Sequence, residues 1–163
     1  MPRIRIRPAV SEDSARIAAM ANALNRFHHL DDTVFSAASV KRDAFGADPA
    51  FSCLVADLDG ETVAYAMYHG CYNSDLAARG LWLVDLFVDE RARGTGLGRR
   101  LMAALSREAL ARGAATLWWG VDSRNAGARA MYQALGAHDH NYRILEFYRE
   151  DLERLAAEAE GEG

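Results

Sequence analysis

The residues of this 163-residue chain with the clearest chemical potential form one glycine-rich segment, Arg91-Ala92-Arg93-Gly94-Thr95-Gly96-Leu97-Gly98-Arg99-Arg100. Glycines at alternate positions let successive backbone N–H groups converge on one point without a Cβ in the way. A helix that begins at this point adds its own free N–H groups and a partial positive charge. The segment therefore predicts a phosphate-binding loop, and a glycine turn needed only for packing is the alternative.

The spacing separates this loop from two common nucleotide-binding loops. No Gly-Lys-Ser/Thr follows, so it is not a P-loop, and the glycines fall as GxGxG rather than as the GxGxxG of a dinucleotide site. Four arginines and no acid surround the glycines, at positions 91, 93, 99 and 100. This charge suits a polyanion. For Arg99 and Arg100 the alternative is a solvated helix face.

A single carboxylate, Asp85, interrupts the apolar run from Leu81 to Val88. Such a run is typical of a strand buried on both faces. A buried carboxylate without a partner is costly, so Asp85 is expected to be a proton-path residue or a structural anchor. Because side chains alternate along a strand, Asp85 should point away from the side of Val84 unless a bulge intervenes.

The elements that must position these groups follow from hydrophobic periodicity, caps and turns. An Asp59-Gly60 dipeptide predicts a tight hairpin, because both turn positions favour positive φ. Helices are expected from Ser11 to about Asn25, from Ser39 to Phe45, from Leu97 to Gly113 and from Asn125 to Leu135. Strands are expected at residues 3–7, 51–58, 61–69, 81–88, 115–121 and 142–148. The order indicates an α/β (mixed α+β) domain with an antiparallel start.

The formal net charge of −4 argues against a non-specific nucleic-acid partner. It is unevenly distributed, since residues 150–163 carry six acids and one base, whereas residues 79–129 carry nine arginines and five acids. Two cysteines without CxxC spacing predict neither a disulfide framework nor a thiolate metal site. No window is apolar enough to span a membrane, so no membrane partner and a cytoplasmic location are expected.

Two motifs resemble a known family. Arg91-x-x-Gly94-x-Gly96 is similar to the R/Q-x-x-G-x-G/A motif of the GNAT superfamily of acyl-CoA-dependent N-acyltransferases. The segment from Asn125 to Gly136 resembles its second block, N-x-x-A-x-x-x-Y-x-x-x-G. Shorter blocks resemble the diamine (spermidine/spermine, thialysine) N-acetyltransferase branch, at residues 42–46, 54–56, 66–68 and 85–88.

The resemblance covers about residues 4–155. It implies a GNAT fold, with a central, mostly antiparallel mixed sheet of six to seven strands, about four flanking helices and a CoA cleft between strands four and five. Residues 1–155 are then a single acetyltransferase domain, and residues 156–163 an acidic, mobile tail. It also implies a homodimer whose acceptor sites draw on both subunits.

Carried over to this sequence, the resemblance implies that the glycine loop holds the CoA pyrophosphate and that the preceding strand lines the pantetheine arm. Tyr132 corresponds to the general acid that protonates the CoA sulfur; without the resemblance it would be an aromatic residue of the core. Asn125 corresponds to a residue that contacts the pantetheine or its bound water. The expected CoA-binding residues are Leu86, Phe87, Val88, Arg93, Gly94, Thr95, Gly96, Leu97, Gly98, Arg99, Asn125 and Ala128.

The acceptor side departs from the diamine branch. Val84-Asp85 stands where that branch has Glu-Asp, and Phe27-His28 where it has Tyr-Glu. Phe27, His28 and Val84 are the expected substrate-binding residues. The general base is then Asp85 or a water chain, and His28 and His29 are further side chains that could take a proton from an amine, with ordinary surface histidines as the alternative. The histidines are not spaced like a metal site, so no metal is expected.

These features predict an enzyme that transfers acetyl from acetyl-CoA to a primary amine of a small molecule, by direct attack in a ternary complex. The missing strand-four glutamate leaves a non-catalytic CoA-binding regulatory module as an alternative. A protein lysine or N-terminal acetyltransferase is the other alternative, and it would need an open, extended acceptor groove.

Overall fold

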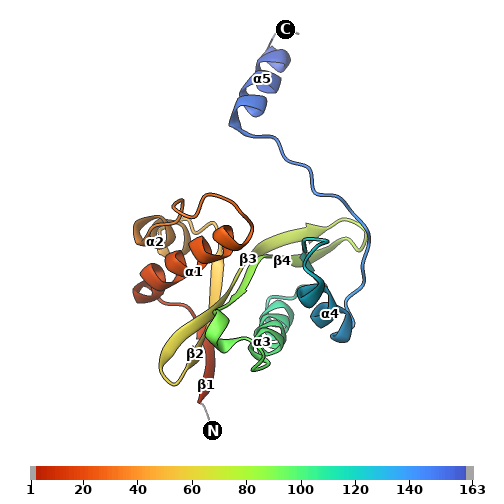
Figure 1. The fold of residues 1–163 in the computed structure, drawn as a ribbon. Helices are drawn as coiled ribbons and strands as arrows, with labels where there is room; N and C mark the ends of the chain where they lie inside the picture. The colour runs from red at the N-terminus through yellow and green to blue at the C-terminus, as the bar shows by residue number, and fades with distance from the viewer. Residues whose placement is uncertain (1–2, 161–163) are drawn as a thin grey trace.

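A computed structural model describes residues 3–160 of the chain. Five strands form one sheet in the order β1-β2-β3-β4-β5; neighbours are antiparallel except β4 and β5, which are parallel (Figure 1). The strands are β1 (Ile4–Pro8), β2 (Ser52–Leu58), β3 (Glu61–Asn73), β4 (Ala78–Val88) and β5 (Thr116–Trp119). The helices are α1 (Ser14–Phe27), α2 (Ala37–Phe45), α3 (Leu97–Ala111), α4 (Ala126–Ala134) and α5 (Arg149–Glu160), with short 3-10 turns η1 (Ser11–Asp13) and η2 (Glu90–Ala92).

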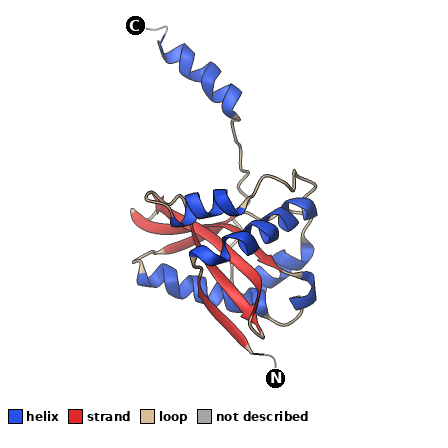
Figure 2. Cartoon of the chain, turned by 90° about the vertical axis from the view of Figure 1, so that its left-hand side faces the viewer, coloured by secondary structure: helices blue, strands red, loops and turns tan. Residues whose placement is uncertain are grey.

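Helices cover both faces of the sheet (Figures 1 and 2). On one face α1 and α2 pack on side chains of β2 and β3 such as Val55 and Tyr65. On the other face α3 buries Leu97, Leu101 and Leu105 against the same strands, and α4 adds Tyr132. The alternation of side chains along each strand thus gives the molecule two separate cores.

The mixed α/β architecture is confirmed, and most predicted elements are present. Both residues of the Asp59-Gly60 turn have positive φ, 53° and 88°, as the hairpin requires. Some predicted bounds were wrong. The cap of α2 is Ser36, whose side chain accepts a hydrogen bond from the N–H of Ser39. Within residues 3–160 the sheet has five strands rather than six or seven.

The strand predicted at residues 142–148 was wrong for this chain. These residues are extended but join no ladder, and all of them are exposed. They leave the body and lead to α5, which stands away from it (Figures 1 and 2). A strand needs a partner for its backbone N–H and C=O groups, and none lies beside these residues. Of the predicted tail, residues 156–160 continue α5, and residues 161–163 lie outside the described part.

A network of ionic hydrogen bonds ties the start of α1 to the sheet. The Arg7 guanidinium donates to Asp13 Oδ2 at 2.7 Å and to Asp57 Oδ2 at 2.9 Å. Asp13 also accepts from the N–H of Val10, so one carboxylate joins β1, η1 and the first turn of α1. The hydrogen bond from Arg7 holds the pKa of Asp13 below its ordinary range.

Replacing Asp13 by Asn should lower the free energy of unfolding by about 2 kcal/mol at neutral pH, because the buried end of Arg7 loses one of its two charged partners. A carboxylate with a lowered pKa stabilises the fold above its unfolded pKa of about 3.9, and this contribution is lost as the pH falls further. In urea denaturation, the free energies of unfolding of the wild-type protein and of Asp13→Asn should therefore converge below about pH 4. The exposed Asp48→Asn is the control, and an equal loss in both variants would contradict the role of Arg7.

In the part of the chain from residue 3 to residue 160, no helix is both long and apolar enough to cross a membrane.

Candidate active site

The sheet opens where β5 ends. Trp119, the last residue of β5, pairs with Leu83, whereas β4 continues to Val88. The N–H of Asp89 donates to the C=O of Val63, which continues the ladder with β3. In an antiparallel pair the backbone groups of alternate residues bond to the same neighbour. The N–H and C=O groups of Leu86 and Val88 therefore face the opposite, open side. This edge of β4 has no neighbouring strand, and the Arg93 side chain occupies only its Val88 carbonyl. It therefore offers backbone donors and acceptors beside the gap, as expected for residues that line an extended ligand arm.

A β-bulge at Val84 places Asp85. Leu83 pairs with Tyr68, and Asp85 pairs with Met67, so Val84 is the extra residue. Without the bulge, Asp85 would lie on the α3 face with Leu83. With it, Asp85 shares the α1–α2 face with Met67 and Tyr65. Val84, 43% exposed, lies at the point where β5 stops.

Asp85 is half-buried and held by one hydrogen bond. The Tyr65 hydroxyl, on a fully buried side chain, donates to Asp85 Oδ2 at 3.1 Å. Loss of solvent raises the pKa of Asp85, while the hydrogen bond from Tyr65 and the charge of His28 partly oppose that rise. The result is a carboxylate that takes up a proton more readily than an exposed one, as a base must.

The end of α1 borders the same gap. His28 lies near enough to Asp85 and Asp122 for its positive form to lower the pKa of both. Phe27 is 54% exposed and meets the His28 ring edge to face. The guanidinium of Arg93, from the glycine loop, lies 5.9 Å from the centre of the Phe27 ring. The predicted acceptor residues Phe27 and His28 are thus close to Asp85 and to the loop.

The glycine loop has the backbone geometry that an anion site needs. Gly94 and Gly96 have φ of 75° and 78°, values that other residues rarely adopt. Within the described chain, the N–H groups of residues 94–99 make no hydrogen bond, and the first bond of α3 runs from Arg100 to Gly96. These free N–H groups and the N-terminus of α3 form a cradle for an anion.

Individual loop residues have different roles. Leu97 is buried in the core, so only its backbone faces the loop. Gly98 allows close packing, because a Cβ there would lie 3.1 Å from Met131 Sδ on α4. Thr95 donates its hydroxyl to Ala92 O, which fixes the loop from inside.

The arginines around the loop are not equivalent. Arg91 is paired with Glu61 and Asp89 and is therefore largely neutralised. Among residues 3–160, Arg93, Arg99 and Arg100 have no carboxylate partner, and Arg93 Nε donates to Val88 O at 3.2 Å. Three unpaired guanidinium groups are thus left to meet an anion.

On α4, the two predicted contact residues are engaged with each other. Asn125 Oδ1 accepts from the N–H of Ala128 at 3.1 Å and so caps the helix. The cap leaves only the amide nitrogen of the Asn125 side chain to meet a ligand. Ala128 packs against the core on the α3 face.

Tyr132 lies on the opposite face of the sheet from Asp85. Its ring packs on Trp119, with centroids 5.0 Å apart, and burial raises the pKa of its hydroxyl. Tyr132 has no hydrogen-bond partner among the described residues, and no fully buried side-chain oxygen or nitrogen there lacks one, so its hydroxyl is not wholly enclosed. Tyr132 is also one of the residues that line a cavity. The hydroxyl is therefore a protonated, accessible donor.

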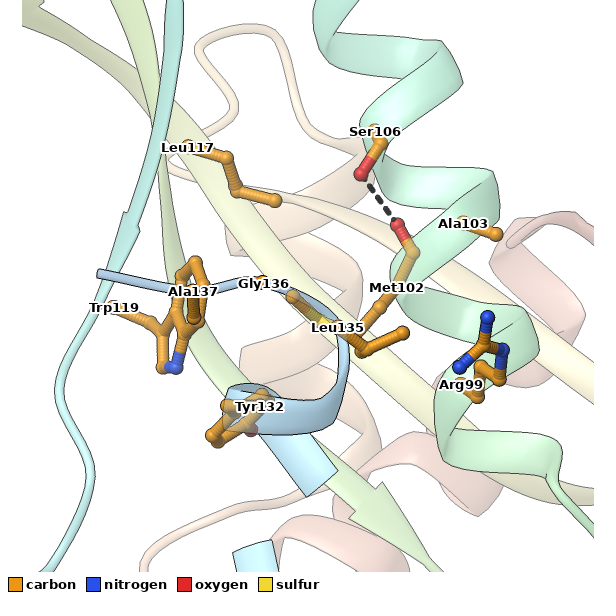
Figure 3. Close-up of a pocket in the computed structure, with 10 residues that line it drawn as sticks. All are labelled: Arg99, Met102, Ala103, Ser106, Leu117, Trp119, Tyr132, Leu135, Gly136 and Ala137. Atoms are coloured by element: carbon orange, nitrogen blue, oxygen red, sulfur yellow. Dashed lines mark hydrogen bonds between the residues drawn. The ribbon is translucent and has the colours of Figure 1, made fainter. Parts of the chain in front are cut away.

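The cavity lies between α3, β5 and α4 and has a volume of about 310 Å³ (Figure 3). Arg99, at the start of α3, and Tyr132 both line it, so one of the arginines without a carboxylate partner and the candidate acid share this space. Its remaining walls are Met102, Ala103, Ser106, Leu117, Trp119, Leu135, Gly136 and Ala137. These walls are largely apolar and suit an uncharged arm rather than a second charge.

Three neighbours of the predicted site residues were not predicted. Tyr65 binds Asp85, Trp119 packs on Tyr132, and Asp122 lies near His28. The adjacent Trp118-Trp119 pair at the end of a predicted strand was the one usable indication for Trp119. Within residues 3–160 no group of three or more His, Cys, Asp or Glu side chains could hold a metal ion.

Comparison with known proteins gives the family. A sequence model of the Acetyltransferase (GNAT) family matches residues 17–137. The thialysine N-epsilon-acetyltransferase of Bos taurus is 30% identical over 96% of this chain and 99% of its own length. This match confirms the resemblance to the diamine acetyltransferase branch.

Solved structures share the fold. An integron cassette protein from V. cholerae superimposes with a TM-score of 0.78 at 22% identity, over 94% of this chain and 97% of its own. An aminoglycoside N-acetyltransferase, solved in complex with CoA, gives 0.73 at 19% identity, over 91% and 97%. Because the family model spans most of the chain and the Bos taurus enzyme is 30% identical over nearly its whole length, the chain belongs to the GNAT family of acetyltransferases.

Proposed function

We propose that this GNAT-family N-acyltransferase transfers an acetyl group from acetyl-CoA to a primary amine of a small molecule, by direct attack within a ternary complex. The observation that carries the proposal is the placement of two groups. Asp85 and Tyr132 lie on opposite faces of the sheet, at the point where β4 and β5 separate. A ligand that occupies this gap would meet a carboxylate on one side and a phenol on the other.

The residues around the gap fit acetyl-CoA. The cradle at residues 94–99, with Arg93 and Arg99, suits a pyrophosphate. The N–H and C=O groups of Leu86 and the N–H of Val88 suit the amide groups of a pantetheine arm, with Phe87 buried behind them. The CoA complex of the related aminoglycoside enzyme supports the choice of cosubstrate.

The reaction needs a neutral amine, because an alkylammonium has a pKa of about 10 and no lone pair. Asp85, directly or through water, removes a proton from the amine on the α1–α2 side. Asp85 then releases this proton to solvent. The amine nitrogen forms a bond to the carbonyl carbon of the thioester and loses its second proton to water, and the carbon–sulfur bond breaks. Tyr132, on the other side, gives its proton to the departing thiolate and recovers one from solvent.

The acceptor side favours an amine with one positive charge next to an apolar group. The half-buried carboxylate of Asp85 would meet the positive charge of the amine. The exposed side chains of Phe27 and Val84 border the same gap and would meet the apolar group. A polyamine would need further acidic contacts, and Phe27-His28 does not supply them. The thialysine enzyme of Bos taurus, named for a small amine substrate, supports a small-molecule acceptor.

The assembly and location that we propose are a homodimer in the cytoplasm. The branch resemblance supports the dimer. Cys53 and Cys71 are free thiols, as expected in a reducing compartment.

The proposed function is tested by calorimetric titration with acetyl-CoA, followed by measurement of CoA thiol release with a panel of amines. We expect micromolar binding, and release that is fastest with apolar monoamines. The panel also contains polyamines, amino acids, aminoglycosides and lysine peptides. Binding without release for any amine would favour a regulatory CoA-binding module, and release with peptides alone would favour a protein acetyltransferase.

Tyr132→Phe should lower kcat by about 100-fold or more, because the thiolate then leaves without a proton donor. Calorimetry should give an unchanged affinity for acetyl-CoA, since the phenyl ring still packs on Trp119. The matched control is Tyr72→Phe, at an exposed tyrosine near the far end of β3. Unchanged turnover in Tyr132→Phe would remove Tyr132 as the acid.

Tyr65→Phe should move the acidic limb of the kcat/KM–pH profile to higher pH. A base works deprotonated, so the rate falls as the pH drops through the raised pKa of Asp85. Loss of the Tyr65 hydrogen bond raises that pKa further. Asp85→Asn should remove this limb together with most of the activity.

The control for Tyr65→Phe is Tyr68→Phe, at a buried tyrosine of the same strand on the other face of the sheet. A limb that shifts equally in both variants, or in neither, would argue for a water chain as the base.

A further inference from the structure

Two tryptophans on neighbouring strands lie outside both cores of the molecule. Trp82 on β4 and Trp118 on β5 are partners in the parallel ladder. Leu81 and Leu117, which precede them, face α3, so the alternation along each strand places both tryptophans on the α1–α2 face. Both are partly exposed, and within residues 3–160 neither packs into the core of either face. The mechanism described above does not use them.

The two tryptophans belong to a row of flat side chains. His69 on β3 pairs with Trp82, so His69, Trp82 and Trp118 follow one another across three strands on one face. We call these three residues the aromatic row. Single apolar side chains on a surface are ordinary, whereas adjacent large rings outside a core indicate a contact surface. The aromatic row therefore needs an occupant.

The aromatic row lies beside the candidate base. Asp85 and Trp82 share one face of β4, and their partners on β3, Met67 and His69, are two residues apart. The side chains of Asp85 and Trp82 therefore leave the sheet about 7 Å apart. The pair Trp82–Trp118 is also the last but one before β4 and β5 separate. The row is thus continuous with the acceptor side, at the closed end of the gap.

The charges of this region favour a ring over a second ammonium group. Asp85 is the single acid in β4, in β5 and in β3 from Tyr65 onward. Asp122, which lies near His28, is bound by Nε and Nη2 of Arg124 at 3.0 and 2.7 Å. One ammonium group therefore meets a carboxylate, and the rest of the acceptor meets aromatic carbon. A second cation over these rings would lose water without gaining a free carboxylate.

We infer that Trp82 and Trp118 bind a ring of the acceptor, and that the acceptor is an arylalkylamine whose amino group lies at Asp85. The inference rests on the proposed function and names the class of amine that this site takes. A planar ring gains both apolar burial and ring–ring contact against two indoles. A short alkyl chain between the ring and the nitrogen spans the step from the tryptophans to the carboxylate. Trp82 and Trp118 are thus specificity-determining residues.

The first test compares three amines in the assay of CoA thiol release, with the full chain. The value of kcat/KM should be at least about 5-fold higher for phenethylamine than for cyclohexylethylamine, because a saturated ring is not planar and has no π face. Cadaverine, which has a second ammonium group in place of the ring, should be a poorer substrate than either. Equal values for the two ring amines, or a higher value for cadaverine, would overturn the inference.

The second test changes the tryptophans. Trp82→Leu and Trp118→Leu should each raise the KM for phenethylamine about 10-fold, because the ring loses one of its two aromatic partners. The KM for cyclohexylethylamine should change by less than about 3-fold, since leucine still offers an apolar surface. The matched control is Tyr72→Leu, at an exposed tyrosine that alternation places on the opposite face of β3. It should leave both values unchanged.

Variants that keep a ring guard against a general loss of structure. Trp82→Phe and Trp118→Phe should stay within about 3-fold of the wild-type KM for phenethylamine, and circular dichroism melts compare the folding of all variants. Phe variants that lose as much as the Leu variants, or Leu variants that weaken both ring amines equally, would show that the tryptophans support the fold and do not read the ring.

Calorimetric titration of phenethylamine in the presence of CoA separates this inference from the proposed function, because it measures binding without turnover. Phenethylamine that binds, loses affinity in the Leu variants and is never acetylated would refute the function alone. Acetylation of both ring amines at equal rates, with no effect of the Leu variants, would refute the inference alone.

Discussion

Two parallel strands of unequal length hold this molecule's chemistry in place. β5 pairs with β4 as far as Leu83, and from there β4 continues to Val88 with β3 on one side and no strand on the other. A gap inside a sheet leaves backbone N–H and C=O groups unpaired, which is costly unless water or a ligand meets them. The anion cradle at residues 94–99 follows β4 after the short turn η2, and the helix that carries Tyr132 follows β5. The loop, the free edge and the phenol therefore surround one opening because of where a single strand stops.

The bulge at Val84 decides which face of the sheet each reactive group occupies. One extra residue transfers Asp85 from the side of α3 to the side of α1 and α2, next to Tyr65. There the carboxylate is partly removed from water, and one long hydrogen bond only partly offsets the loss of its hydration. A carboxylate in this position makes the fold less stable than a leucine would. A loss of stability of this kind is common at sites where a protein retains a reactive side chain. The network around Arg7 contributes in the opposite direction, since it anchors α1, whose last turn carries Phe27 and His28.

Much of this arrangement was predictable from local chemistry. The Asp59-Gly60 turn, the apolar run of β4 and the glycine loop depend on backbone preferences that act over a few residues. The face occupied by Asp85 was not predictable, because a bulge depends on the register with β3 and leaves no mark in the sequence of β4 alone. The roles of Tyr65 and Trp119 depend on contacts across 20 and 13 residues, and periodicity does not report such contacts. The extended segment after α4 has the composition of a strand, but a strand also needs an edge to pair with, and that edge is a property of the tertiary or quaternary structure.

Arg93 touches three parts of the site at once. Its backbone begins the glycine loop, its Nε donates to the carbonyl of Val88 on the free edge, and its guanidinium lies over the ring of Phe27 at the acceptor side. A ligand phosphate competes with that carbonyl and that ring for the same cation. Any movement of Arg93 toward a phosphate thus changes the surface offered to the amine. Thermodynamic linkage requires this effect to be mutual. If the phosphate-bearing ligand changes the affinity for the amine by some factor, the amine changes the affinity for that ligand by the same factor. One side chain would thereby couple the two halves of the proposed bisubstrate site.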